Sequence, residues 1–371
     1  MTRARLSDAD LAAGAKLMAR LDAFAAFTDE PGRLTRLFLS DAHRAAAQAF
    51  IGWCAEAGLQ ARIDAAGNVA ARYDGRRADA PALMLGSHID TVRDAGRYDG
   101  NYGALAALAV VEALASGGER LEHAVEIVAF GDEEGVRFRS TLTGSRALAG
   151  RYEEDALDQK DGGGVLMRDA LRAFGGDPDR AGSIRAKNVA AFVEAHIEQG
   201  PVLEAEGLPL GIVTAINGAT RLEIGVDGVA GHAGATPMAL RRDALTAAAE
   251  MALALEARAR GDPDLVATVG RLEVWPGATN VIPGHVQFSV DLRAPDDARR
   301  AAALADVQAS IRSIAAARGV RATVAKTHEA DAFVCDPRIV AANGPARCVK
   351  TSGIHARNGS GPQGHTHNPR A

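Results

Sequence analysis

Histidines and carboxylates follow an apolar run of the chain at spacings that suit metal binding and acid–base chemistry. His88 and Asp90 end the run LMLGSHID, and Asp99 follows in a glycine-rich loop that opens a predicted helix. Residues i and i+2 of a strand share a face, so Asp90 can hydrogen-bond His88 and leave its other ring nitrogen for a metal. Asp99 can reach the same place as a bridging carboxylate. Taken alone, an HxD pair is more often a structural histidine beside a carboxylate.

A second acidic group ends the next apolar run, EIVAF. Asp132, Glu133 and Glu134 stand in a row between two glycines. Three adjacent carboxylates repel one another unless a cation lies among them or they face water, and a solvated acidic turn is the plain alternative. One strand–helix–strand crossover separates the two acidic segments, so their loops should be neighbours. This order along the chain favours a shared cation site.

Further segments carry polar residues of the same kind. FVEAHIEQG holds His196 and Gln199, VAGHAGATPM holds His232, and WPGATNVIPG and DLRAP hold Asn280 and Arg293. Each has a simpler interpretation as a buried histidine, a turn or surface charge. Arg293 has the planar guanidinium that matches a carboxylate in two hydrogen bonds. Together, these segments favour a catalytic site.

The elements that must position these residues indicate an α/β fold with two parts. The first part has helical spacing at its start, with Ser7 and Ser40 or Asp41 as N-caps and Gly58 as a stop, and then apolar strands around a helix. Continuous apolar strands are typical of a mainly parallel sheet, whose ligands lie at the strands' C-terminal ends. The predicted helices are 8–27, 41–58 and 103–116, and the predicted strands are 68–73, 82–87 and 124–130.

The second part begins near residue 211. From there the predicted strands alternate apolar and polar residues, and two strand-and-helix units follow one another along the chain. This pattern predicts an inserted α+β domain that resembles a ferredoxin-like sandwich. Its predicted strands are 222–226, 265–274, 285–292 and 321–325, and its predicted helices are 238–260 and 297–318.

Composition excludes several classes of protein. The 371 residues include 42 Lys and Arg against 47 Asp and Glu, a formal net charge of −5, without a block of like charge. Nucleic-acid and anionic-membrane binding are therefore not expected. The three cysteines have no CxxC spacing, and no stretch of about 20 apolar residues occurs. A cytoplasmic protein is expected.

Taken together, the segments resemble the metal-dependent amidases of the hydantoinase/carbamoylase family, in the dinuclear aminopeptidase and carboxypeptidase clan. The resemblance runs from about residue 10 to residue 340 and rests on GSHIDTVRDAGRYDG, FGDEEGVRF, TLTGSRALAG, VEAHIEQGPVLE, GHAGATPM, TNVIPG and DLRAPDD. FGDEEGVRF followed by TLTGS is most similar to the allantoate amidohydrolases of that family.

The resemblance implies a site with two divalent metal ions per subunit, Mn²⁺ or Zn²⁺. By position, His88, Asp99 and His196 would hold one ion, and Asp99 would bridge to a second ion held by Glu134. Glu133 would be the general base, while Asp90 steadies His88. The implied substrate-binding set is Gln199, His232, Asn280 and Arg293.

The resemblance also implies an activity and a partner. The expected reaction is hydrolysis of the ureido C–N bond of allantoate, a small ureido acid, with release of ammonia and carbon dioxide. An N-carbamoyl-L-amino-acid hydrolase or β-ureidopropionase is the alternative. The family forms homodimers through the inserted domain, whose histidine, here His232, reaches the partner's active site.

The predicted domain boundaries follow the resemblance. Residues 1–211 with 326–342 form the expected catalytic domain, and 212–325 form the lid and dimerisation domain. From about Asn343 the family pattern is lost and the text is rich in Gly, Pro, Asn and Arg, so 343–371 is predicted to be a disordered tail. A truncated or frameshifted homologue without activity is therefore a second alternative.

Overall fold

The computed structural model describes residues 7–342, 348–349 and 354–357, and the chain divides into two compact units. The first unit runs to Thr214 and resumes at Cys335, while the second is Ala215–Val334. The predicted inserted domain, 212–325, thus starts slightly before the second unit and ends within its last long strand, β13 (Arg321–Ala330).

Two helices open the first unit. α1 (Asp8–Ala25) follows Ser7, whose hydroxyl accepts from the Asp10 amide while the Asp10 carboxylate accepts from the Ser7 amide. α2 (Asp41–Glu56) follows Ser40, whose hydroxyl accepts from the amide of His43 at 3.1 Å. Both hydroxyls satisfy amides that have no partner within the helix. The predicted helices and serine N-caps are confirmed, and each helix ends two residues before its predicted end.

A six-stranded sheet forms the centre of this unit, in the order β1–β2–β4–β3–β5–β16. β3 is parallel to β4 and β5, whereas the pairs β1–β2, β2–β4 and β5–β16 are antiparallel. The predicted α/β fold with parallel strands is confirmed for the centre of the sheet, and the margins are antiparallel. The strands are β1 (Gln60–Ile63), β2 (Val69–Tyr73), β3 (Ala82–His88), β4 (Val125–Phe130), β5 (Val189–Ala195) and β16 (Ile354–Arg357).

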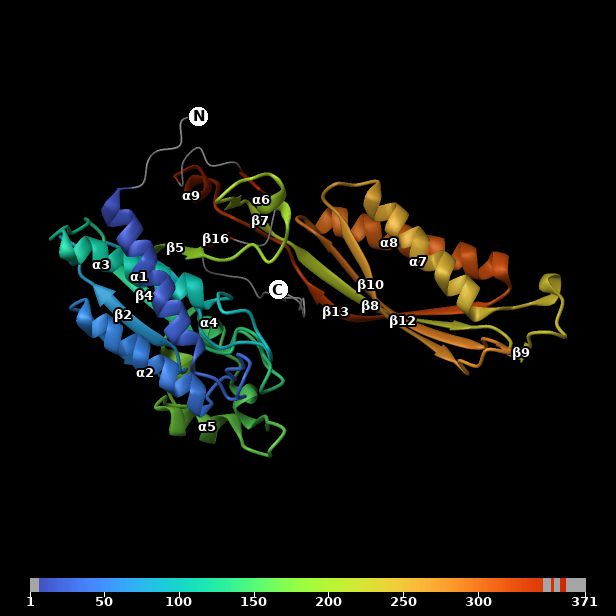
Figure 1. Cartoon of the computed structure of the whole chain (residues 1–371), viewed down its shortest axis with the longest axis horizontal. Coiled ribbons are helices and arrows are strands. Elements are labelled where there is room, and N and C mark those ends of the chain that lie inside the picture. Colours follow the sequence, from blue (N-terminus) through green and yellow to red (C-terminus); the bar gives the residue numbers. More distant parts are fainter. Residues whose placement is uncertain (1–6, 343–347, 350–353, 358–371) are drawn as a thin grey trace. The chain divides into compact units, whose positions relative to one another are not determined.

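Helix α3 (Asn101–Ser116) connects β3 to β4 and packs on the sheet through a continuous apolar core. Leu105, Leu108 and Val111 of the helix belong to the same buried cluster as Ile127 of β4. Figure 1 shows α1, α2 and α3 beside the strands of this unit. Because β3, β4 and β5 run in one direction, their C-terminal ends meet at one edge. That edge carries the segments that follow each strand.

Short elements complete the first unit. Two strands lie in the segment predicted to be a tail without secondary structure: β15 pairs with β6, and β16 pairs with β5. The rest of that predicted tail lies outside the described residues. The short elements are α4 (Thr143–Leu148), η1 (Glu154–Asp158), α5 (Met167–Phe174), η2 (Ala181–Ser183), α6 (Val202–Ala205), β6 (Ile212–Val213), α9 (Pro337–Ala342) and β15 (Cys348–Val349).

The second unit is a four-stranded antiparallel sheet with two helices. Its order, β10–β12–β8–β13, with α7 and α8 as the crossover helices, is that of a ferredoxin-like sandwich, as predicted. The long elements are β8 (Gly218–Asp227), α7 (Ala244–Arg260), β10 (Val266–Trp275), β12 (His285–Ala294), α8 (Asp297–Arg318) and β13. The short ones are β7 (Ala215–Ile216), β9 (Gly231–His232), η3 (Met238–Leu240), β11 (Val281–Ile282) and β14 (Phe333–Val334).

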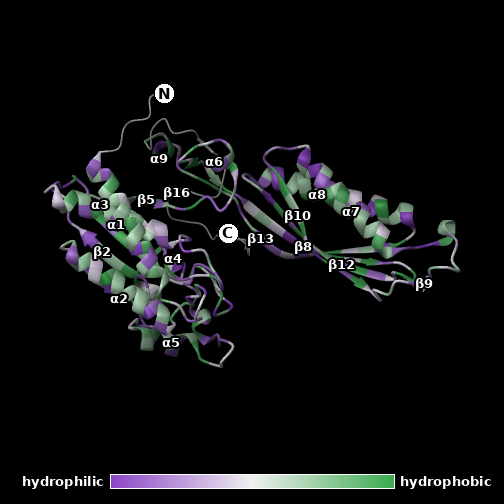
Figure 2. Cartoon of the chain, viewed as in Figure 1, coloured by the Kyte–Doolittle hydropathy of each residue, from purple (hydrophilic) through white to green (hydrophobic). Residues whose placement is uncertain are grey.

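The core of the second unit lies between its helices and one face of its sheet. Met251 and Leu255 of α7, with Ile311 of α8, share a buried cluster with Ile224 and Phe288 of the sheet. Figure 2 shows both hydrophobic and hydrophilic residues along α7 and α8, as expected for helices with one buried face. Among the described residues, no helix of either unit is long and apolar enough to cross a membrane.

Helix α7 begins later than the sequence predicts. The predicted helix starts at Met238, but the structure has the short helix η3 there and α7 starts at Ala244. Asp243 is the reason for the later start, because its carboxylate accepts hydrogen bonds from the amides of Leu245 and Thr246. An aspartate N-cap fixes where the helix begins.

Candidate functional site

Three predicted metal ligands meet at the C-terminal edge of the parallel strands. His88 ends β3, His196 directly follows β5, and Asp99 lies in the loop before α3. The Nε2 atoms of His196 and His88 lie 3.3 Å and 3.8 Å from Oδ1 of Asp99. One ligand atom from each of the three residues lies within 4.8 Å of the others. The three side chains are therefore close enough to share one cation.

Main-chain carbonyls orient both imidazoles. Nδ1 of His88 lies 2.9 Å from the carbonyl of Asp90, and Nδ1 of His196 lies 2.9 Å from the carbonyl of Ile197. A carbonyl only accepts, so each Nδ1 is the protonated nitrogen and donates. In the neutral ring, the lone pair of each Nε2 is then directed to the side of Asp99. Two imidazole nitrogens and a carboxylate are a donor set that transition metals favour.

The side chain of Asp90 has different hydrogen-bond partners from those that the sequence predicts. Its Oδ1 lies 3.9 Å from Nδ1 of His88, too far for a hydrogen bond, so the prediction that the carboxylate fixes the His88 tautomer is wrong. The carboxylate instead accepts from the amides of Glu133 and Glu134, at 3.1 Å each. These two amides occupy its oxygens, and the main-chain carbonyl orients the ring. Asp90 thereby ties the acidic loop after β4 to the end of β3.

The acidic loop brings two further carboxylates to His88. Ligand atoms of His88, Glu133 and Glu134 also lie within 4.8 Å of one another, so His88 belongs to two groups able to hold a metal ion. Glu134 is predicted to hold a metal ion together with Asp99, whereas in this second group it lies with His88 and Glu133. Asp132, the first residue of the acidic row, is buried and accepts from the hydroxyls of Ser140 and Thr143.

The electrostatics of the site favour added positive charge. Burial lowers the pKa of His88, but the surrounding carboxylates outweigh it and raise that pKa to about 10. Burial and the neighbouring carboxylates, against the attraction of His88, raise the pKa of Glu134 to about 9. Oδ1 of Asp99 is buried without a hydrogen-bond donor among the described residues. An excess of buried carboxylates around two imidazoles fits a bound divalent cation.

The absence of a side chain at Gly100 leaves room for the imidazole of His88. Its φ of +63° lies in the left-handed region that favours glycine. A Cβ at this position would lie 2.4 Å from Cε1 and Nε2 of His88. Any larger residue would therefore displace the ring or the loop that carries Asp99.

Gln199 lies beside the same group. Its side-chain amide donates to Oδ2 of Asp99 at 2.8 Å, and its backbone has a φ of +56°. The carboxylate of Asp99 thus has one oxygen beside the imidazoles and the other on Gln199. In this structure the amide of a residue predicted to bind substrate orients a predicted metal ligand.

The other three predicted substrate-binding residues lie in the second unit. His232 is exposed in β9, which pairs with β11, and the amide of Ala233 donates to the carbonyl of Asn280 at 2.9 Å, so His232 and Asn280 are neighbours. Arg293 lies apart on β12, where Nε and Nη2 donate to Asp291 at 2.8 and 3.1 Å.

A family model described as "Peptidase family M20/M25/M40" matches residues 84–370. The chain belongs to this peptidase family. The match includes residues 343–370, which the sequence analysis places outside the resemblance. This family is one of hydrolases, in agreement with the predicted resemblance of the chain to metal-dependent amidases.

Relatives of this M20 chain include allantoate deiminases and N-carbamoyl-L-amino acid amidohydrolases. It is 40% identical over 347 residues to allantoate deiminase from Arabidopsis thaliana, an alignment that covers 87% of this chain and 66% of the relative. It is 41% identical over 325 residues to N-carbamoyl-L-amino acid amidohydrolase from Geobacillus stearothermophilus, covering 87% and 80%. The chain spans about two thirds of the length of the plant relative.

Solved structures of the same kind share the fold. A hydantoinase/carbamoylase family amidase from Burkholderia ambifaria has a TM-score of 0.84 and 39% sequence identity, with 92% of this chain and 86% of that chain covered. A second such amidase, from Burkholderia multivorans, has a TM-score of 0.84 at 37% identity, covering 89% and 80%. The predicted resemblance to this family is thereby confirmed.

A buried cation behind the site of this M20 chain is not apparent from the sequence. Arg36 is fully buried, and its guanidinium donates to the carbonyl of Phe24 at 3.0 Å and to Oδ1 of Asn101 at 2.9 Å. Burial lowers the pKa of Arg36 to about 10, against the attraction of Asp90 and Asp29. Arg36 holds the first residue of α3, next to the loop of Asp99. A lone arginine in a loop gives no sequence signal of such a role.

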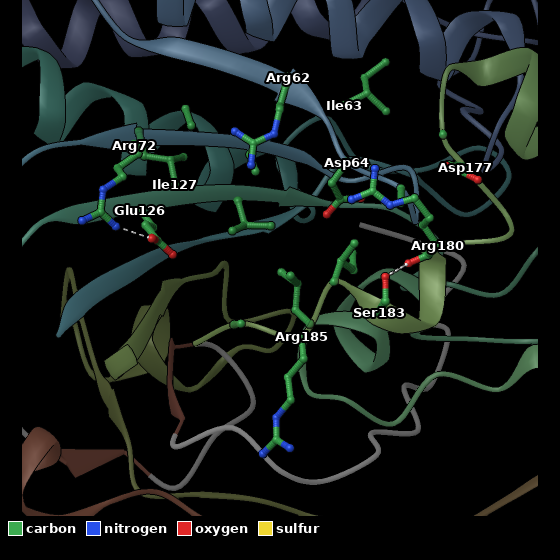
Figure 3. Close-up of a pocket in the computed structure, with 18 of the residues that line it drawn as sticks. Arg62, Ile63, Asp64, Arg72, Glu126, Ile127, Asp177, Arg180, Ser183 and Arg185 are labelled. Atoms are coloured by element: carbon green, nitrogen blue, oxygen red, sulfur yellow. Dashed lines mark hydrogen bonds and ion pairs between the residues drawn. The ribbon is translucent and has the colours of Figure 1, made fainter. Parts of the chain in front are cut away.

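The M20 chain also has a cavity of about 700 Å³ on its first unit that is separate from the predicted site. Met84 and Val128 contribute to its lining, and so do Arg72 and Glu126, which form an ion pair at 2.6 Å (Figure 3). None of the ten predicted site residues lines it. This cavity is therefore not part of the predicted site.

Proposed function

We propose that this chain hydrolyses the ureido C–N bond of a small ureido acid, with allantoate as the first candidate, and releases ammonia and carbon dioxide. The observation that carries the proposal is the meeting of His88, Asp99 and His196 with Glu133 and Glu134 at one edge of the sheet. The names of the relatives support it, since one is a deiminase of allantoate and the other an amidohydrolase of N-carbamoyl-L-amino acids.

The proposed cofactor is a pair of divalent ions, Mn²⁺ or Zn²⁺, and the imidazoles and carboxylates that meet at this edge support it. His88, Asp99 and His196 would hold one ion, and Glu134 with Asp99 would hold the other. When bound, such ions polarise a carbonyl and lower the pKa of a water molecule. The tautomers set by the carbonyls of Asp90 and Ile197 would present both Nε2 atoms for this purpose.

Glu133 is the proposed general base. Its backbone amide is held by Asp90, so its position is fixed relative to the end of β3. A carboxylate at this place can take a proton from the attacking water and pass it to the leaving nitrogen. Asp90 contributes by holding the loop rather than by touching the substrate.

Arg293 is proposed to bind the carboxylate of the substrate. The further proposed substrate-binding residues are Gln199, His232 and Asn280. Asp291 holds Nε and Nη2 of Arg293, and Arg221 donates to the same carboxylate at 3.2 Å. This arrangement orients the guanidinium. A homodimer in which His232 serves the partner's site belongs to the same proposal.

Replacing Arg293 by Lys tests this assignment. We expect Arg293→Lys to raise KM for the ureido acid at least about tenfold with a smaller change in kcat, because a point charge replaces a planar fork. Steady-state kinetics on the acid and on its uncharged amide measure the effect. Equal turnover of acid and amide by the parent chain would contradict the role.

An N-carbamoyl-L-amino-acid hydrolase is the second candidate, favoured by the 41% identity to the Geobacillus enzyme. The same metal ligands serve both reactions, so only pocket shape separates them. Metal content together with ammonia release from allantoate, ureidoglycolate and a set of N-carbamoyl-L-amino acids decides. Bound metal without ammonia from any of them would support the third possibility, a homologue without activity, and would overturn the proposal.

A further inference from the structure

A buried hydrogen bond joins the two strands that carry the imidazoles. Oγ of Ser87 on β3 donates to Oε1 of Glu194 on β5 at 2.5 Å. Ser87 is fully buried, and Glu194 is only 7% exposed. Ser87 directly precedes His88, and Glu194 precedes His196 by two positions. Each member of this Ser87–Glu194 pair therefore lies next to one predicted metal ligand.

The fold alone does not require a carboxylate at this place. Burying a carboxylate is costly unless it is paired or hydrogen-bonded, and an apolar residue would pack between strands at less cost. β3 and β5 pair up to Leu85 and Val193, so the regular ladder stops just before Ser87 and Glu194. The side-chain bond continues the connection where the backbone pairing ends.

Helix α3 closes over the same pair. A Cβ added to Gly103 would lie 2.1 Å from the carbonyl of Ala195 and 2.7 Å from Cβ of Ser87. Only glycine lets the first turn of α3 come this close to both strand ends. Two contacts thus hold the ends of β3 and β5 together: the Ser87–Glu194 hydrogen bond between the strands, and the close packing of the first turn of α3 against both of them.

We propose that the Ser87–Glu194 pair is a positioning pair that sets the separation of His88 and His196, and thereby the affinity of the site for a divalent metal. The two imidazoles are stacked with centroids 5.8 Å apart, next to the pair. This proposal rests on the metal site of the proposed function. It assigns the effect to the geometry of the hydrogen bond and not to the charge of Glu194.

Two variants separate geometry from charge. Ser87→Ala removes the donor and leaves the charge, whereas Glu194→Gln removes the charge and keeps an acceptor oxygen for Ser87. We expect Ser87→Ala to weaken Zn²⁺ binding about 10–100-fold, the range found for residues that orient metal ligands, and Glu194→Gln to weaken it less than about threefold. Competition with a chromophoric chelator measures the affinity, without substrate.

The visible spectrum of bound Co²⁺ reports the ligand arrangement directly. We expect Ser87→Ala to shift the Co²⁺ bands and Glu194→Gln to leave them in place. Thr220→Val is the matched control, because its buried hydroxyl also meets a charged group, Arg300, at 2.7 Å, but in the other unit. This control should keep the parent's affinity, and thermal unfolding of each variant shows that it is folded.

The outcomes separate this proposal from the proposed function. Unchanged Zn²⁺ affinity in Ser87→Ala, or a loss only in Glu194→Gln, overturns the positioning role. A parent chain that binds metal but hydrolyses no ureido acid overturns the proposed function and leaves the positioning pair standing. A parent chain that binds no divalent metal overturns both.

Discussion

His43 and His88 are buried histidines of the same unit, and their surroundings shift their pKa values in opposite directions. Burial lowers the pKa of His43 to about 3, and the cations Arg36 and Arg137 add to the lowering. Burial also lowers the pKa of His88, but four carboxylates reverse the effect and raise it to about 10. Burial alone therefore does not mark a functional histidine. The sign of the neighbouring charges does.

The two histidines also use their ring nitrogens differently. Nδ1 of His43 accepts from the amide of Leu39 at 3.0 Å, and its ring stacks on Phe174 with centroids 4.7 Å apart. Nδ1 of His88 donates to a carbonyl, which leaves Nε2 facing Asp99. His43 is neutral and packs in the core near α2, whereas the carboxylates around His88 favour a bound cation.

The largest expected effect concerns the carboxylates around His88. We expect Glu133→Gln to lower kcat on the preferred ureido acid by about 10²–10⁴-fold while metal content stays that of the parent, because the base is lost but no proposed metal ligand is. Ammonia release and elemental analysis measure both quantities. Turnover within a few fold of the parent would remove Glu133 from the mechanism.

Removal of His88 itself should abolish tight metal binding. His88 belongs to both groups of residues that could hold an ion, so we expect His88→Ala to weaken Zn²⁺ binding by more than about 100-fold. His123→Ala is the control, since His123 is exposed, its Nδ1 lies 2.7 Å from the carbonyl of Pro81, and it belongs to neither group of residues that could hold an ion. Equal metal affinity in the two variants would refute the proposed site.

A smaller effect is expected from the contrasting histidine. The folded pKa of His43, about 3, lies below its ordinary value of 6.5, so the unfolded chain binds a proton that the folded chain rejects as pH falls. Stability from this residue is present above pH 6.5 and is lost between pH 6.5 and pH 3. From pH 7 to pH 5, the loss amounts to about 2 kcal/mol.

The variant His43→Asn tests this pH dependence. Asn keeps an acceptor for the Leu39 amide but does not titrate, so its free energy of unfolding should fall about 2 kcal/mol less than the parent's between pH 7 and pH 5. Urea unfolding at the two pH values measures the difference. Parallel losses in parent and variant would show that His43 is not the source.

The smallest expected effect is on the free energy of unfolding, from a substitution beside His43 and not beside His88. Ser40 caps α2 by accepting a hydrogen bond from the amide of His43, and it belongs to neither group of residues that could hold an ion. We expect Ser40→Ala to lower the free energy of unfolding by about 1 kcal/mol and to leave Zn²⁺ affinity unchanged. Denaturant unfolding and metal titration give both values, and a weaker metal site in this variant would mean that the two regions are coupled.

Local patterns predicted much of this molecule. Serine N-caps placed α1 and α2, and apolar runs placed β3, β4 and β12 within about two residues of their ends. Such signals act between residues close in the chain, so they survive without knowledge of the fold. The start of α7 was wrong because apolar spacing continues across η3, and only the carboxylate of Asp243 decides where the helix begins.

The sequence by itself determined the segments that carry the candidate metal ligands, since their resemblance to a known family implies His88, Asp99, Glu134 and His196. Only the tertiary structure decided how each atom is used. The carbonyl of Asp90 orients His88 while its carboxylate holds the acidic loop, and Ser87 meets Glu194 from 107 positions away. The physical reason is that hydrogen bonding and burial depend on distances between remote segments, which packing of the sheet and α3 sets.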